Sequence, residues 1–187
     1  MTSTADALVI FGATGDLAFK MIFPALAEID QGAFDLGAGS GVECPALATI
    51  EDSKFILGAG AVFHDGSGPA TYSSKAIWSS WDAIGSSSYD DPGTWNPDLM
   101  KATGAGTLLD LSSVGSIDAG FTSGGNDYTY QTISALDGGI IDLSGVEMIT
   151  APLSGRDRID FIVTGAESRI DLSGLRWVIS TYHGYYP

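Results

Sequence analysis

Three aspartates are the residues of this sequence whose type and spacing could do chemistry together. Asp110, Asp142 and Asp171 each follow an aliphatic residue and precede Leu-Ser, and they lie 32 and 29 residues apart. If their segments stack as coils about 4.8 Å apart, the carboxylates form one column. The column could bind calcium through its oxygens, each aspartate could cap the bend that follows it, or the coils could be out of register. We expect bend capping, with calcium as the alternative.

A second candidate site is a glycine turn near the start of the chain. Residues 7–11 are a short apolar strand, residues 12–16 a turn, and residues 17–29 carry apolar side chains at helical spacing. Residues 6–26 resemble the NADP-binding N-terminus of the glucose-6-phosphate dehydrogenase family. In that family, amides at the start of the helix meet the pyrophosphate. The resemblance implies that this role falls to Gly12, Thr14, Gly15, Asp16 and Leu17.

The dehydrogenase resemblance stops after about Leu26. No second strand with a ribose-binding residue follows, no substrate motif of that family follows, and neither His64 nor His183 has its sequence context. A lone strand–turn–helix unit cannot form the crevice that holds a dinucleotide. We therefore expect no useful NADP binding and no cofactor, and we predict that an amphipathic helix over residues 17–29 caps one end of a solenoid.

A third candidate site lies in residues 64–98, where the apolar pattern of the flanking segments is interrupted. This stretch contains Trp78, Trp81 and Trp95 among Ser, Gly, Asp and Pro. Long turn-rich insertions often carry binding sites. Aromatic faces next to carboxylates suit a sugar, so a carbohydrate is one candidate partner. The other interpretation is a local cluster that holds the insertion against the rest of the fold.

A repeat predicts the elements that must position these residues. One phrase, aliphatic-Asp-Leu-Ser-(Gly or Ser)-aliphatic, occurs at residues 109–114, 141–146 and 170–175, each time after a glycine-containing turn. Self-similarity at this period is typical of solenoids. The apolar positions fit a strand, a bend and a second strand, with Leu111, Leu143 and Leu172 at equivalent inward positions. The sequence therefore predicts a mainly β fold, a right-handed parallel β-helix.

Residues 99–178 resemble the right-handed β-helix repeats of bacterial surface proteins, the haemagglutinin-like adhesins. A leucine-rich repeat is the nearest alternative, but its asparagine is replaced here by Val114, Val146 and Leu175. The resemblance implies a non-enzymatic structural or adhesive solenoid at the cell surface or outside the cell, although residues 1–7 lack the basic start of a secretion signal. The alternatives are a cytoplasmic NADP-binding fragment and a β-helix that binds or cleaves carbohydrate.

The predicted organisation has three parts. Residues 1–31 form the strand and helix of the cap, and residues 32–45 form a glycine-rich linker. Residues 46–187 form the solenoid, with a degenerate coil at 46–63 and the tryptophan-rich insertion at about 64–98.

Composition narrows the classes of partner. With 23 acidic and 8 basic residues the net charge is -15, which excludes nucleic acid as a partner because its binding needs basic groups. No apolar stretch is long enough to span a membrane, and Cys44 alone cannot form an internal disulfide. We find no nucleophile, histidine and carboxylate set, so an enzyme is not expected. The aromatic tail carries no charge after Arg176, so we predict a homo-oligomer through the solenoid ends.

Overall fold

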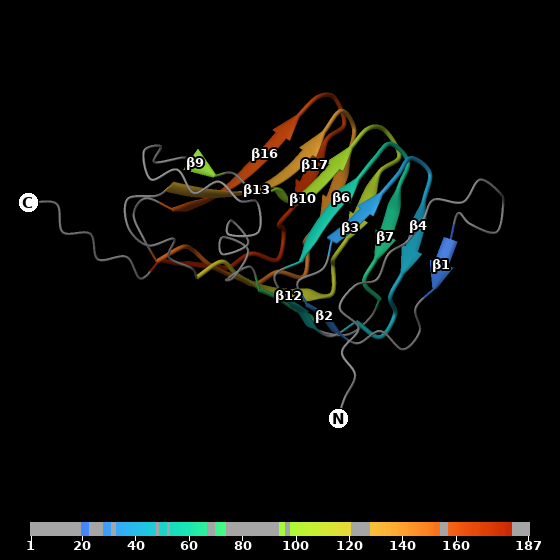
Figure 1. The fold of residues 1–187 in the computed structure, drawn as a ribbon. Helices are drawn as coiled ribbons and strands as arrows, with labels where there is room; N and C mark the ends of the chain where they lie inside the picture. Colours follow the sequence, from blue (N-terminus) through green and yellow to red (C-terminus); the bar gives the residue numbers. More distant parts are fainter. Residues whose placement is uncertain are drawn as a thin grey trace, which may run out of the picture.

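The computed structural model describes residues 20–22, 28–30, 33–47, 49–51, 53–66, 70–73, 94–95, 98–120, 128–153 and 157–180. These residues form short strands that stack on one another like rungs (Figure 1). Every pairing between named strands in this part of the chain is parallel. The chain is a parallel β-helix, as the sequence predicts.

The strands form three sheets. In spatial order, sheet 1 contains β1 (Lys20–Ile22), β4 (Gly41–Glu43), β7 (Val62–His64), β11 (Leu108–Asp110), β14 (Ile140–Asp142) and β17 (Arg169–Asp171). Sheet 2 contains β3 (Ala33–Leu36), β6 (Lys54–Leu57), β10 (Asp98–Thr103), β13 (Tyr128–Leu136) and β16 (Arg158–Thr164), and β9 (Thr94–Trp95) pairs with β13. Sheet 3 contains β2 (Glu28–Asp30), β5 (Thr49–Glu51), β8 (Ala70–Ser73), β12 (Val114–Asp118), β15 (Met148–Thr150) and β18 (Trp177–Ile179).

One coil visits sheet 2, then sheet 1, then sheet 3. In the coil β13–β14–β15, a glycine turn separates the first two strands, and Gly138 has the positive φ of 91° that this turn requires. The Asp-Leu-Ser-Gly bend separates the second and third strands. Leu109, Ile141 and Ile170 are register partners in successive coils of sheet 1. The repeat phrase therefore marks the same corner of each coil.

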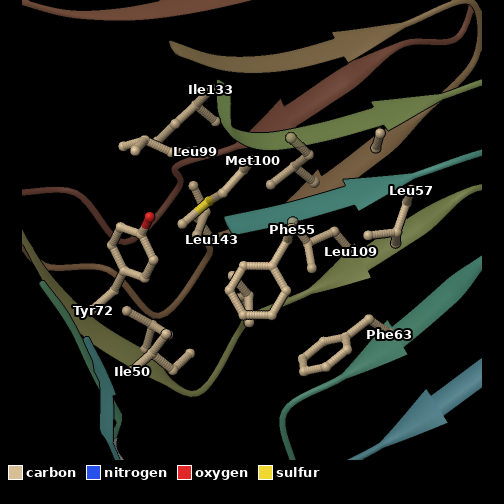
Figure 2. Packing of buried hydrophobic residues seen from close by; sticks show 14 of the residues in the cluster. Ile50, Phe55, Leu57, Phe63, Tyr72, Leu99, Met100, Leu109, Ile133 and Leu143 are labelled. Atoms are coloured by element: carbon tan, nitrogen blue, oxygen red, sulfur yellow. The ribbon is translucent and has the colours of Figure 1, made fainter. Parts of the chain in front are cut away.

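The core is the column of inward side chains enclosed by the three sheets (Figure 2). Phe34 and Phe55 stack with ring centroids 5.4 Å apart, and Phe63 meets both rings edge-on. Leu111 and Leu143 are fully buried, while Leu172 is partly buried against the same core. The predicted inward ladder of these three leucines is confirmed.

The first third of the chain differs from the prediction. Within the segment 17–29, predicted as a helix, β1 and β2 are strands that pair with β4 and β5. Ile29 stands between Glu28 and Asp30, an alternation that fits a strand as well as a helix. Pairing with the next coil favours the strand over the helix. The helical cap is therefore wrong for the described residues of this segment.

The predicted linker and insertion also have different boundaries. Residues 33–47 lie in a coil rather than a linker, because β3 and β4 pair with β6 and β7 and bury Phe34 and Val42. Residues 70–73, placed in the insertion by the sequence, form β8 between β5 and β12. Residues 74–93 and 96–97 lie outside the described part of the chain.

Candidate functional site

The last coil of the stack is the strongest candidate for a functional surface. We call residues 157–180 the terminal coil; its strands β16, β17 and β18 are the last strands of their sheets (Figure 1). Phe161 and Val163 stand over the buried residues Ile133 and Ala135 of the preceding coil. They are core positions, yet they are 37% and 52% exposed. The exposure follows from their place at the end of the stack.

The third sheet ends in the same way. Val178 is the register partner of Ile149, which is 2% exposed, but Val178 itself is 65% exposed. Its neighbour Trp177 is 66% exposed. Soluble proteins seldom expose a contiguous group of large apolar side chains, and such a group often marks an interaction surface. The terminal coil exposes six of them: Phe161, Ile162, Val163, Trp177, Val178 and Ile179.

The backbone of the terminal coil also has a free side. The N–H of Arg169 donates to the carbonyl of Gly139, and the carbonyl of Asp171 accepts from the N–H of Leu143, so both residues point back to the preceding coil. Backbone groups alternate in direction along a strand. The N–H and C=O of Ile170 therefore point to the open end, where the described residues form no further strand. Such an edge can template pairing with another chain.

The two ends of the stack are not alike. At the other end, β3 is the last strand of sheet 2, but its inward residues Phe34 and Leu36 are only 6% and 4% exposed. The corresponding strand of the terminal coil, β16, exposes its inward residues several times more. Among the described residues of sheet 2, apolar core positions are therefore exposed at the terminal coil and buried at the opposite end.

Charge is distributed with the same asymmetry. All four arginines of the chain, Arg156, Arg158, Arg169 and Arg176, fall in its last 32 residues. Residues 154–187 also contain four acidic residues, so the net charge of -15 belongs entirely to residues 1–153. Electrostatic self-repulsion is therefore weakest at the terminal coil, next to its exposed apolar side chains.

The three predicted aspartates form the expected column. Asp110, Asp142 and Asp171 are register partners. Each Oδ1 accepts a hydrogen bond from the backbone N–H two residues later, at 3.0 Å from Ser112, 2.9 Å from Ser144 and 3.0 Å from Ser173. Bend capping is confirmed. No group of three His, Cys, Asp or Glu residues that could hold a metal ion occurs in the part of the chain that the structure describes.

His64 extends this column by one coil. Its Nδ1 lies 2.8 Å from Asp110 Oδ2. Partial burial raises the pKa of Asp110, but the hydrogen bonds from Ser112 and His64 outweigh this effect and lower the pKa below its ordinary value. His64 and Glu43 also border a shallow cavity of about 260 Å³ lined mainly by the glycine turns around Gly39 and Gly60. The contacts of the aspartate column are thus those of structural caps and of a hydrogen bond between His64 and Asp110.

Asp65 is a buried acid that the sequence analysis missed. It is 1% exposed; its Oδ2 accepts from Ser113 Oγ at 2.6 Å, and its Oδ1 has no hydrogen-bond partner. Burial raises the pKa of Asp65 to about 6, although the bond from Ser113 lowers it. Burial and the nearby Asp65 in turn raise the pKa of Cys44 to about 11. The carboxyl group of Asp65 can therefore take up a proton near neutral pH while the protein is folded.

The only trace of Asp65 in the repeat phrase is a serine in place of a glycine, and its meaning depends on the structure. The repeat phrase has Gly145 and Gly174 in its last two copies, where an added Cβ would lie only 2.1 Å from the carbonyl oxygen of Ser112 and 2.2 Å from that of Ser144. The first copy has Ser113 at this position instead. Ser113 faces Asp65 of the preceding coil, so a side chain fits there and forms a hydrogen bond.

The other predicted site residues are not tested. Gly12, Thr14, Gly15, Asp16 and Leu17 lie outside the described residues, as do Trp78 and Trp81. The backbone of Trp95 pairs with Thr129 through β9 and β13. The NADP and carbohydrate predictions therefore remain predictions.

Three sheets of stacked, in-register parallel strands define this protein as a β-solenoid of the parallel β-helix class. Comparisons with protein-family models, with curated proteins and with solved structures found no match. The resemblances to adhesin repeats and to glucose-6-phosphate dehydrogenase therefore rest on the sequence phrases alone. Among the described residues there is no helix of the length and apolarity that crossing a membrane takes.

Proposed function

We propose that this chain is a non-enzymatic structural or adhesive β-solenoid of a cell-surface or extracellular protein, and that it associates with another molecule through its terminal coil. The observation that carries the proposal is the exposure of core-position residues, above all Val163 and Val178, on strands that pair on one side only with other described strands. Burying these residues against a partner removes apolar surface from water.

The body of the solenoid supports this proposal. Its coils are held in register by parallel pairing in all three sheets, and the packed rings of Phe34, Phe55 and Phe63 fill the core of the first coils. This is a continuous rod-like scaffold. The acidic residues of the other coils repel copies that approach side by side, which directs association to the terminal coil.

Sedimentation velocity over a hundredfold concentration range tests the proposal. We expect the wild-type mass to rise with concentration, and we expect Val178→Lys to move that rise to about tenfold higher concentration, because a charge then has to enter the contact. Leu108→Lys is the matched control, since Leu108 is an outward aliphatic residue of an inner coil. A monomer throughout the range, or equal effects of both substitutions, contradicts the proposal.

A further inference from the structure

The central edge strand of the terminal coil has a self-complementary sequence. β17 reads Arg169-Ile170-Asp171, with Ile170 packed partly against the core and the two charged residues on the opposite face of the strand. The free N–H and C=O of Ile170 point to the open end, as the bonds of its two neighbours require. In an antiparallel pair, residues directly opposite each other share a face. The side chains of β17 in one molecule therefore match those of an antiparallel β17 in a second molecule.

Centred on Ile170, this pairing satisfies both the backbone and the charges. The two copies of Ile170 exchange both N–H···O bonds. Arg169 of each copy then lies opposite Asp171 of the other, which gives two opposite-charge pairs of the kind that stabilises antiparallel strands. A one-residue shift would place Ile170 of one copy opposite a charged residue of the other, so that inward and outward side chains would share a face. The register is therefore fixed by the apolar face.

A two-fold axis through the middle of β17 also pairs the remaining strands. The chain runs β16, β17, β18 around the coil, so the rotation exchanges the outer two and places β16 of one copy against β18 of the other. These strands carry the six exposed apolar side chains, Phe161, Ile162 and Val163 on β16 and Trp177, Val178 and Ile179 on β18. In this arrangement the apolar strands β16 and β18 contact each other across the two copies, and the charged strand β17 pairs with itself. An isologous contact, which uses the same surface on both copies, requires this symmetry.

Head-to-tail stacking is less well matched. Continuing the register of sheet 1 into a second copy would place Arg169 beside Lys20, a like-charge pair. The end that would receive the terminal coil also has its inward residues Phe34 and Leu36 already buried. A head-to-tail contact would moreover repeat into a filament.

We infer that the partner of the terminal coil is a second copy of this chain, bound as a closed two-fold dimer in which β17 pairs antiparallel with itself. This inference rests on the proposed function and adds the identity of the partner and the geometry of the contact.

A charge exchange within β17 tests this geometry. By sedimentation velocity we expect Arg169→Asp to raise the dimer dissociation constant about tenfold, because two attractive pairs become repulsive. Asp171→Arg should have a similar effect. The double variant R169D/D171R restores opposite charges only in an antiparallel self-pair, so its dissociation constant should return to within about threefold of wild type. It also lacks the Asp171 cap on Ser173, as does Asp171→Arg, so that loss cannot explain the recovery.

The possible results distinguish the β17 pairing, the two-fold contact and self-association from one another. A double variant as weak as the single ones overturns the β17 pairing. Species that grow beyond the dimer with concentration overturn the two-fold contact but leave self-association standing. A monomer at every concentration overturns the proposed function as well.

Cross-linking supplies a readout that does not depend on affinity. In a Cys44→Ala background, chains with Arg169→Cys are mixed with chains with Asp171→Cys. The predicted pairing sets these positions opposite each other as a non-hydrogen-bonded pair, about 4.5 Å apart at Cα, which is within disulfide range. We expect disulfide-linked dimers in the mixture and far fewer from either variant alone. Equal yields from the mixture and from the separate variants contradict the geometry.

Discussion

The inner coils and the terminal coil carry the same repeat phrase but have different neighbours. Leu143 is fully buried between two coils, whereas Leu172 packs against a coil on one side only. Asp142 has an aspartate above and below it, whereas Asp171 has one such neighbour among the described residues. In a solenoid each unit contacts only the units next to it. The comparison shows that the place in the stack, and not the phrase itself, sets the energetic contribution of a residue.

The largest expected difference is in the leucine ladder. Leu143→Ala should lower the free energy of unfolding by about 2 to 5 kcal/mol, because it leaves a cavity in a closed core. Leu172→Ala should cost about 1 kcal/mol, because water can fill the space at the open end. Urea unfolding at a concentration below dimer formation measures both values. Equal losses would mean that the terminal coil is buried in solution.

The second expected difference is in the pH dependence of stability, which should be opposite for the buried Asp65 and for Asp171 at the open end of the stack. Because the folded-state pKa of Asp65 is raised from 3.8 to about 6, its stabilising contribution is present below pH 3.8 and is lost as the pH rises through 6. Asp65→Asn should therefore increase the free energy of unfolding at pH 7 by about 1 to 3 kcal/mol. Below about pH 4 the gain should vanish.

Thermal or urea unfolding of both proteins from pH 4 to pH 8 checks this prediction. The exposed Asp171 is the contrast, since the hydrogen bond from Ser173 lowers its pKa and its contribution is lost as the pH falls. A gain for Asp65→Asn that does not change with pH would show that Asp65 is not buried as a charged group.

The smallest expected effect concerns the aspartate column. Asp142→Asn keeps an oxygen that can cap Ser144 but removes the like-charge contact with both neighbours. It should stabilise the protein by about 0.5 to 1 kcal/mol at low salt, and the gain should shrink at high salt. Asp171→Asn should have a smaller effect, because its single column neighbour is Asp142. Denaturant midpoints of both variants at two salt concentrations measure these effects, and a loss of stability for Asp142→Asn would contradict the prediction of like-charge repulsion in the column.

The parts of the fold that could be predicted from the sequence are those encoded locally. The bend caps join Asp110, Asp142 and Asp171 to residues only two positions away, so the phrase itself predicts them. Asp65 could not be found in this way, because its partner Ser113 is 48 residues distant. The exposure of Val178 likewise depends on which strands lie beside it. The apolar, uncharged end of the sequence indicated only that an end was available for association.

The N-terminal coils were mispredicted for a related reason. Phe34 pairs with Phe55 and Val42 with Phe63, so this coil spans 21 residues, against 32 and 29 between the successive copies of the Asp-Leu-Ser phrase. It lacks the Asp-Leu-Ser phrase, and without that anchor its glycines at 37 and 39 suggested a linker. Pairing between strands, rather than local preference, determines the structure there.

The glycine bends also determine how the molecule could change in length. Gly145 rests on the carbonyl of Ser112, and Gly174 rests in the same way on that of Ser144. The bends at Gly145 and Gly174 therefore contact the preceding coil in the same way. A tandem duplication of residues 141–169 would add a coil whose bend, cap and leucine find their partners without other change, and it would lengthen the rod by about 4.8 Å. Duplication and deletion of whole coils therefore provide a simple evolutionary route to rods of different lengths.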